Sequence, residues 1–126
     1  MTAPVPFSKP LHGKRVAVEP AERAGRLVIR RLIDGEAVGC AEWQLREGTL
    51  HIASLAIEEA HRGFGAGSEA ARLVVEGALE RAERVTAWAP KHLGLAVYFW
   101  FRMGFRPVPG EGPDGGLLFE RGRRGG

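Results

Sequence analysis

The sequence predicts a mixed α/β (α+β) fold, in which one mostly antiparallel sheet is accompanied by two helices. Three observations lead to this prediction. Alternating strand-like runs with glycine turns fill the chain from residue 26, one strongly periodic helical run follows, and shorter strand and helix runs close it. The length of 126 residues is that of one domain, so we expect a single domain over residues 1–126.

Three strand-like runs precede the helical run. They are "RLVIRRLI", "EAVGCAEWQL" and "TLHIASLAI", separated by turns at Asp34-Gly35 and Glu47-Gly48. Short turns of this kind join neighbouring antiparallel strands, so we expect a three-stranded meander. Residues 1–25 show little pattern beyond a short strand near Arg15–Val18, and we expect them to form an arm of uncertain structure.

The helical run has one apolar side and one charged side. The apolar side comprises Ala70, Leu73, Val74, Gly77 and Ala78, and the charged side Glu69, Arg72, Glu76, Glu80 and Glu83. Glycine in a helix interior costs about 1 kcal/mol relative to alanine. Gly77 therefore predicts a close approach of the helix to the sheet.

Shorter elements follow this helix. "RVTAWAP" has the pattern of a strand, and a strand–helix–strand unit of this length predicts that it pairs in parallel with "TLHIASLAI". "LGLAVYFWFRM" is apolar almost all round, which predicts a buried helix ending at Gly104. "FRPVP" and "GLLFER" complete an antiparallel hairpin, and we expect residues 122–126 to be a flexible tail.

Composition narrows the classes of function. The 18 basic and 15 acidic residues are interspersed and give a net charge of +3, which does not favour a nucleic-acid-binding surface. Cys40 is the single cysteine, and no cluster has metal-ligand spacing. The longest apolar run is far below the roughly 20 residues of a membrane span, and no signal peptide is recognisable. We therefore expect a soluble, cytoplasmic protein that binds no metal, nucleic acid or membrane.

The glycine-rich stretch "HRGFGAGS", residues 61–68, separates the third strand from the first helix. Free backbone N–H groups and the helix dipole favour an anion at such a place. A Walker-type loop needs a lysine that this stretch lacks. A dinucleotide fingerprint needs an acidic residue after the next strand, where Ala89 and Pro90 stand instead. A flexible turn without a ligand remains an alternative.

Arg62-x-x-Gly65-x-Gly67, directly after a strand, resembles the acyl-CoA-binding signature of the GNAT superfamily of N-acyltransferases. "LAIEEAHRGFGAGSEAARLV" is similar to that family's strand–loop–helix core in length and register. "AVYFWFRMGF" resembles its later motif, in which an aromatic residue and a terminal Gly-Phe mark the second core helix. The resemblance runs from Arg26 to Arg121, most of the chain.

The resemblance implies a sheet whose central parallel strand pair splays apart, with acetyl-CoA as co-substrate. In the family the pantetheine arm pairs with the strand before the loop, and the pyrophosphate accepts hydrogen bonds from the loop backbone. A charged Arg62 would add to this binding, although a solvated surface cation is the alternative. The implied cofactor-binding residues are Leu55, Ala56, Ile57, Arg62, Gly63, Phe64, Gly65, Ala66, Gly67, Ser68 and Trp100.

Acetyl transfer to an amine needs a base for the amine, a donor that polarises the thioester carbonyl and an acid for the leaving thiolate. The backbone N–H of Ile57 is the candidate polarising group. His51 stands where family members often carry a carboxylate base, and imidazole is a competent base near neutral pH. The alternatives are a packing role for His51 and a carboxylate base at Glu42.

The acid is harder to assign. Many family members place a tyrosine five residues before the Phe of Gly-Phe, and Trp100 occupies that position here. An indole donates a hydrogen bond but does not protonate a thiolate. Tyr98, two residues away, would face a nearly opposite side of the helix. Either a local register shift lets Tyr98 act, or solvent protonates the thiolate, or the protein binds acyl-CoA without transferring the group.

The segment before "RLVIRRLI" is short, about 25 residues. Family members place there a strand and two helices that cover the acceptor side, so that cover is reduced or missing. This favours an open site for a large acceptor such as a protein amine, or a site completed by a second subunit in a homodimer. The predicted function is acetyl-CoA-dependent N-acetyl transfer to an amine. The alternative is a catalytically weak acyl-CoA-binding or sensing module.

Overall fold

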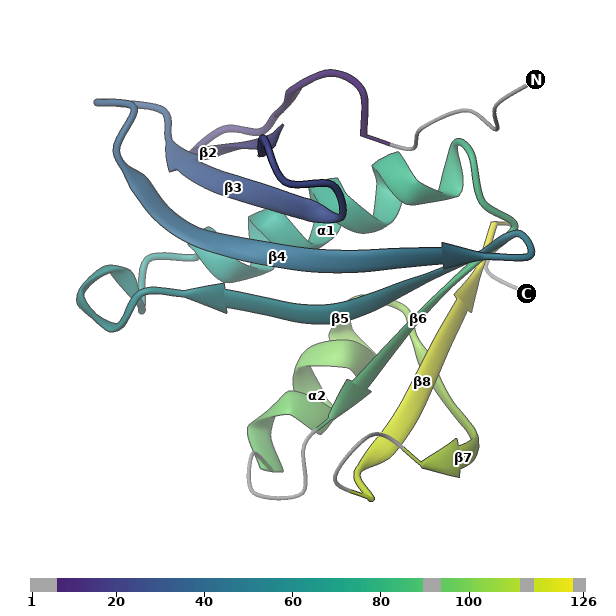
Figure 1. Ribbon diagram of the computed structural model, residues 1–126. Coiled ribbons are helices and arrows are strands. Elements are labelled where there is room, and N and C mark those ends of the chain that lie inside the picture. Colours follow the sequence, from purple (N-terminus) through teal and green to yellow (C-terminus); the bar gives the residue numbers. More distant parts are fainter. Residues whose placement is uncertain (1–6, 90–93, 112–114, 124–126) are drawn as a thin grey trace.

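The computed structural model describes residues 7–89, 94–111 and 115–123, which form a single eight-stranded sheet with two α-helices (Figure 1). The order of strands across the sheet is β1-β2-β3-β4-β5-β6-β8-β7. The strands are β1 Leu11–His12, β2 Val16–Pro20, β3 Arg26–Arg31, β4 Ala37–Arg46, β5 Thr49–Ile57, β6 Arg84–Ala89, β7 Arg106–Glu111 and β8 Leu117–Gly122. The helices are the 3₁₀ turn η1 Glu59–His61, α1 Ala66–Leu79 and α2 Gly94–Arg102.

The predicted meander is confirmed, because β3, β4 and β5 pair antiparallel in chain order. The structure adds β1 and β2 on its outer side, within the segment that we expected to be an arm. Val16, Ala17 and Val18 of β2 are all buried. A strand without an exposed face has no alternating pattern, and the sequence therefore indicated only a short strand here.

Helix α1 begins after Gly65 and buries the predicted apolar side. Ala70, Val74 and Ala78 are fully buried in the core shared with the sheet. Gly77 does make a close approach, but to the side chains of Leu11 in β1 and Phe7 rather than to the central strands. A Cβ at Gly77 would lie 2.6 Å from Cδ1 of Leu11.

The parallel pair β5–β6 is short. Paired positions run only from Thr49 to His51 on β5 and from Arg84 to Thr86 on β6. Both strands continue beyond this point, β5 to Ile57 and β6 to Ala89. The two strands therefore diverge, and the sheet has the predicted splay at its centre.

Helices α1 and α2 lie on the same face of the sheet. Each connects two strands that run in parallel, β5 to β6 and β6 to β7, and right-handed crossovers in the same direction place both helices on one side. Both lie behind the sheet in Figure 1. Within the described residues no helix covers the opposite face.

The expectation that α2 is buried on all sides is wrong. Trp100 is buried, but Tyr98 is 68% exposed and Phe101 is 50% exposed. The physical reason is that α2 has the sheet on one side only, so its outward face remains in solvent although it is apolar.

The C-terminal hairpin is confirmed, with β7 and β8 antiparallel. The predicted start of the tail is wrong, because Gly122 belongs to β8 and Arg123 is anchored. The guanidinium of Arg123 donates to the carbonyl oxygens of Leu79 and Ala82 at 3.0 and 3.1 Å. These carbonyls at the end of α1 would otherwise lack partners, so Arg123 acts as a C-terminal cap.

Candidate active site

The splay opens into a cavity of about 770 Å³ between β5, β6, α2 and the glycine-rich loop. We call it the central cleft. Its walls combine strand backbone, loop backbone and aromatic rings. The lining residues are Ile52, Ala53, Ser54, Leu55, Ala56, Ile57, His61, Arg62, Gly63, Gly65, Ala66, Gly67, Ser68, Trp88, Phe99 and Trp100. All the predicted cofactor-binding residues except Phe64 are among them.

The edge of β5 that faces the cleft carries three amide groups from alternate residues. The carbonyl of Ile57 accepts a hydrogen bond from Nε of Arg62 at 2.9 Å, and that of Ala53 accepts one from Nε1 of Trp88 at 3.2 Å. The next N–H, of Glu58, points the other way, to Val38 of β4. Since amide groups alternate along a strand, Leu55 also faces the cleft. The backbone N–H and carbonyl of Leu55 therefore lie open to the cleft, between the carbonyls of Ala53 and Ile57, which are already hydrogen-bonded.

Arg62 is an exposed residue that also contacts the protein. Its hydrogen bond to Ile57 links the glycine-rich loop to the end of β5. The remaining nitrogens of the guanidinium keep their donors for an anion at the cleft.

The glycine-rich loop needs two of its glycines for conformational reasons. Gly63 and Gly65 have φ of 89° and 81°, in the left-handed region where other residues are strained. Gly65 is also the N-cap of α1 and provides no side-chain cap. The first N–H groups of α1, at residues 66–68, are thus available to an anion in the cleft.

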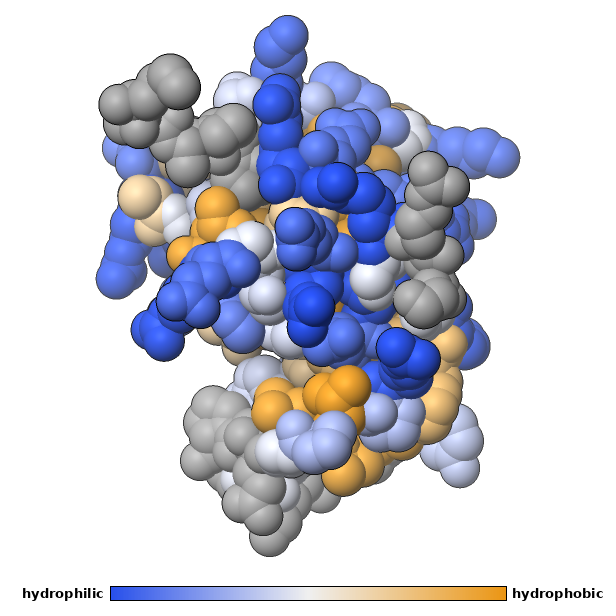
Figure 2. Space-filling model, turned by 90° about the vertical axis from the view of Figure 1, so that its right-hand side faces the viewer, coloured by the Kyte–Doolittle hydropathy of each residue, from blue (hydrophilic) through white to orange (hydrophobic). Residues whose placement is uncertain are grey.

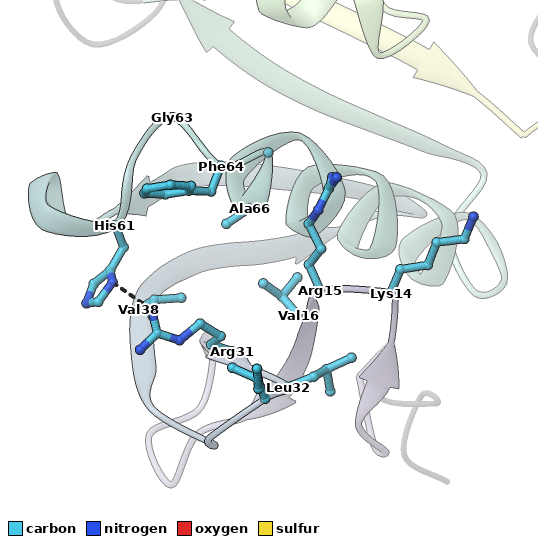
Figure 3. Close-up of a pocket in the computed structure, with 12 residues that line it drawn as sticks. Lys14, Arg15, Val16, Arg31, Leu32, Val38, His61, Gly63, Phe64 and Ala66 are labelled. Carbon is cyan, nitrogen blue, oxygen red and sulfur yellow. Dashed lines mark hydrogen bonds between the residues drawn. The ribbon is translucent and has the colours of Figure 1, made fainter.

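A second cavity of about 790 Å³ lies on the other side of the same loop (Figure 3). Lys14 and Arg15 line it from the segment between β1 and β2, and Phe64, which is 72% exposed, lines it from the loop. A Cβ at Gly65 would lie 2.8 Å from Nη1 of Arg15. Sequence reasoning missed Lys14 and Arg15, because they come from the segment without a regular pattern.

Arg31 and His61 also line this second cavity. Arg31 Nη1 lies 3.3 Å from Nδ1 of His61, the contact dashed in Figure 3. Arg31 also binds the carboxylates of Asp34 and Glu36, each at 2.7 Å. The hydrogen bond from Arg31 lowers the pKa of Asp34 to about 2. The charge of Arg31 is therefore largely compensated within its own hairpin.

Glu69 holds the start of β2 against the first turns of α1. Its Oε1 accepts hydrogen bonds from the backbone N–H groups of Arg15 and Val16 at 2.6 and 2.8 Å. Burial alone would raise the pKa of Glu69, but these and a further backbone hydrogen bond from Lys14 favour the charged form and leave the pKa below its ordinary value. The sequence placed Glu69 on the charged side of the helix without a partner.

His51 lies at the last paired position of the parallel strands. Its Nδ1 is 2.5 Å from Oγ1 of Thr86, directly opposite on β6. It is half-buried and is not among the residues that line the cleft, whereas the next residue of β5, Ile52, is. Glu42, the alternative base, is exposed on β4 opposite Ser54 of β5, which lines the cleft.

Trp100 and Tyr98 are separated by the structure. Trp100 is buried, lines the cleft, and packs against the rings of Phe99 and Phe105 at centroid distances of 5.0 and 4.9 Å. Tyr98 is exposed and does not line the cleft. The helical spacing predicted these opposite directions, and no local register shift brings Tyr98 inward.

The comparisons with known proteins agree with this geometry. The model of the Acetyltransferase (GNAT) family matches residues 4–105. The chain therefore belongs to the GNAT acetyltransferase family. No curated protein matches the chain.

Several solved structures share the fold. An acetyltransferase of the GNAT family from Bacillus anthracis has a TM-score of 0.77 at 12% identity, with 91% of this chain and 99% of that chain covered. A GCN5-related N-acetyltransferase from Brucella melitensis has a TM-score of 0.77 at 14% identity, with coverage of 97% and 82%. A GNAT family acetyltransferase from Elizabethkingia anophelis with acetyl-CoA bound has a TM-score of 0.65 at 16% identity, with coverage of 77% and 74%.

Two further observations concern the described residues alone. No group of three or more His, Cys, Asp or Glu side chains in this part of the chain is gathered as a metal site requires. Neither of its α-helices has the length and hydropathy needed to cross a membrane.

Proposed function

We propose that the protein is an acetyl-CoA-dependent N-acetyltransferase that moves the acetyl group directly from the cofactor to an amine. One observation carries the proposal. The open backbone edge at Leu55 and the N–H groups at residues 66–68 line one continuous cavity. The first lies on β5, and the second at the start of α1, directly after the loop that follows β5. A ligand with amides in its middle and phosphates at one end matches both parts.

The proposed orientation of the cofactor follows from these two parts. The pyrophosphate accepts hydrogen bonds from the loop and from the start of α1. The pantetheine arm then runs back along β5 and pairs with Ile57, as an added strand would. The thioester consequently lies beside Leu55, and its acyl group points toward Ala53, at the inner end of the cleft.

The proposed reaction has no covalent enzyme intermediate. The amine nitrogen attacks the thioester carbonyl, the new C–N bond forms, and the C–S bond breaks to release the thiolate of CoA. The sequence favoured the N–H of Ile57 as the polarising group. Leu55 lies two residues further inward on the same edge, so we assign polarisation to its N–H and pairing with the arm to Ile57.

His51 is the proposed base. Thr86 binds Nδ1 and so fixes the ring, and Nε2 has no hydrogen-bond partner among the described residues. A water between Nε2 and the amine would let His51 take the proton. The thiolate takes its proton from solvent, because Trp100 lacks an acidic proton and Tyr98 lies outside the cleft.

The acceptor reaches the thioester from the sheet face that no described helix covers. An uncovered face admits a bulky acceptor, so we propose the α-amine or a lysine side chain of a polypeptide.

The test is release of free CoA thiol in the presence of acetyl-CoA and a panel of small amines, peptide α-amines and lysine-containing peptides. We expect release with peptide amines, and faster release than with small amines. Binding of acetyl-CoA without release on any member of the panel would support the acyl-CoA-binding module instead. His51→Ala should lower the rate with peptide amines and leave acetyl-CoA affinity unchanged.

A further inference from the structure

We infer that Trp88 closes the inner end of the central cleft and restricts the transferred acyl group to acetyl or propionyl. This inference rests on the proposed function, because it takes the loop as the pyrophosphate end of the site. It concerns the acyl chain, which neither the family nor the fold determines.

The position of Trp88 follows from the strand register. The last paired positions are His51 on β5 and Thr86 on β6. Two residues further along each strand stand Ala53 and Trp88, which would face each other if pairing continued. Instead, the indole N–H of Trp88 donates to the carbonyl of Ala53 at 3.2 Å. A side chain has thus replaced the backbone ladder at the point where the strands separate.

The cleft edge of β5 is consequently bounded at both ends. Arg62 occupies the carbonyl of Ile57 near the loop, and Trp88 occupies that of Ala53 at the inner end. Four residues of strand separate these carbonyls, a length of about 13 Å at roughly 3.3 Å per residue. A cofactor arm that runs along this edge, with its thioester beside Leu55, points its acyl group at the indole.

Trp100, another aromatic residue that lines the cleft, is fixed in the core. Trp100 is buried and held between Phe99 and Phe105 in edge-on and tilted ring contacts. Such packed rings do not move without opening the core. Trp88 is different, because it is only half-buried and its partner Ala53 is exposed. The indole is therefore the part of the inner wall that a substitution removes with least effect on the core.

The experiment compares acyl-CoA chains of two, three, four, six and eight carbons in thiol release and in calorimetric binding. In the natural protein we expect kcat/KM to fall by about 100-fold between acetyl-CoA and hexanoyl-CoA, the scale on which a pocket rejects added methylenes. Trp88→Ala should reduce this discrimination at least tenfold. Trp88→Phe keeps most of the ring without the N–H, and it should retain the discrimination within about threefold if the ring itself blocks the chain.

The outcomes separate this inference from the proposed function. If no acyl-CoA binds, the proposed function fails. If all chain lengths are bound and used equally by the natural protein, the inference that Trp88 limits the acyl chain is wrong while the proposed function stands. Equal discrimination between chain lengths in the natural protein and in Trp88→Ala also overturns this inference. If Trp88→Ala does not fold, judged by its circular dichroism and thermal transition, Trp88→Leu takes its place, and the chain-length series of the natural protein still decides.

Discussion

Single side chains attach the glycine-rich loop and its helix to the rest of the sheet. Arg62 binds the end of β5, and Glu69 binds the start of β2. Neither residue belongs to a hydrophobic pattern. Arg62 binds a backbone carbonyl five residues before it, and Glu69 binds backbone N–H groups more than fifty residues before it. The sequence could predict Arg62 from its motif, but the role of Glu69 depends on where β2 lies.

Glu69→Gln should destabilise the protein by about 1 kcal/mol at pH 7, because it removes a charge-assisted contact to two backbone N–H groups. The folded-state pKa of Glu69 lies below its ordinary value of 4.5, so its stabilising contribution is present above that pH and is lost as pH falls through the folded pKa. The difference in urea-unfolding free energy between the two proteins should therefore shrink below pH 4.5.

The matched control is Glu76→Gln, on the exposed side of the same helix. We expect no change in its unfolding free energy at either pH. A destabilisation of Glu69→Gln that is the same at pH 7 and at pH 3 would contradict the charged role of this carboxylate.

Tyr98→Phe should leave the rate of thiol release unchanged within about twofold, because the hydroxyl lies outside the cleft and solvent supplies the proton. The measurement is kcat/KM with the best amine of the panel, across pH 6 to 9. A loss of tenfold or more, together with a shifted alkaline limb of the pH profile, would restore Tyr98 as the acid.

At the scale of elements, one arginine of the last strand and one directly after it donate to carbonyls at the ends of both α-helices. Arg123 caps the end of α1, and Arg121 donates to the carbonyl of Met103 just after α2 at 3.1 Å. Two of the clustered C-terminal arginines, Arg121 and Arg123, thus bind helix-end carbonyls and link the helices to the end of β8.

Arg123→Ala should destabilise the protein by about 1–2 kcal/mol, because it leaves two carbonyls at the end of α1 without their charged donor. For a chain of this size the thermal midpoint should fall by about 4–8 °C. Arg81→Ala removes an exposed arginine at the same end of the helix and should change the midpoint little. An equal shift in both variants would show that Arg123 has no specific capping role.

Elements with one buried and one exposed face could be predicted from the sequence. The meander β3–β5, helix α1 and the hairpin β7–β8 all show periodicity or turn signals of that kind. In β2 polar and apolar residues do not alternate, because its first three residues are all buried. In α2 the two faces differ little in polarity, because the exposed face is also apolar. In these two elements tertiary packing, not local pattern, determines burial.

The candidate site divides in the same way. Its loop and strand edge were predicted because a motif ties them to one short segment, residues 55–68. Trp88 and Thr86 were missed because they act across the splay, and only the register of the parallel pair brings them opposite Ala53 and His51.

At the scale of the whole molecule, both α-helices of the described residues lie on one face of the sheet, and the proposed acceptor approaches from the other. Figure 2, turned to view the right-hand side of Figure 1, shows mostly hydrophilic side chains with hydrophobic ones in small separate groups. A broad apolar patch of the kind that marks permanent interfaces is not visible among the described residues on this face. This face therefore gives no support to the homodimer alternative.

The central claim is that the splayed strands and the glycine-rich loop together bind acyl-CoA. Titration calorimetry with acetyl-CoA, CoA and NAD tests it most directly, with the natural protein beside Arg62→Ala and the exposed-surface control Arg72→Ala. We predict that acetyl-CoA and CoA bind once per chain, that NAD does not bind, and that only Arg62→Ala weakens the affinity, by about tenfold or 1.4 kcal/mol. Absence of binding by both CoA species, or equal binding of NAD, would contradict the claim.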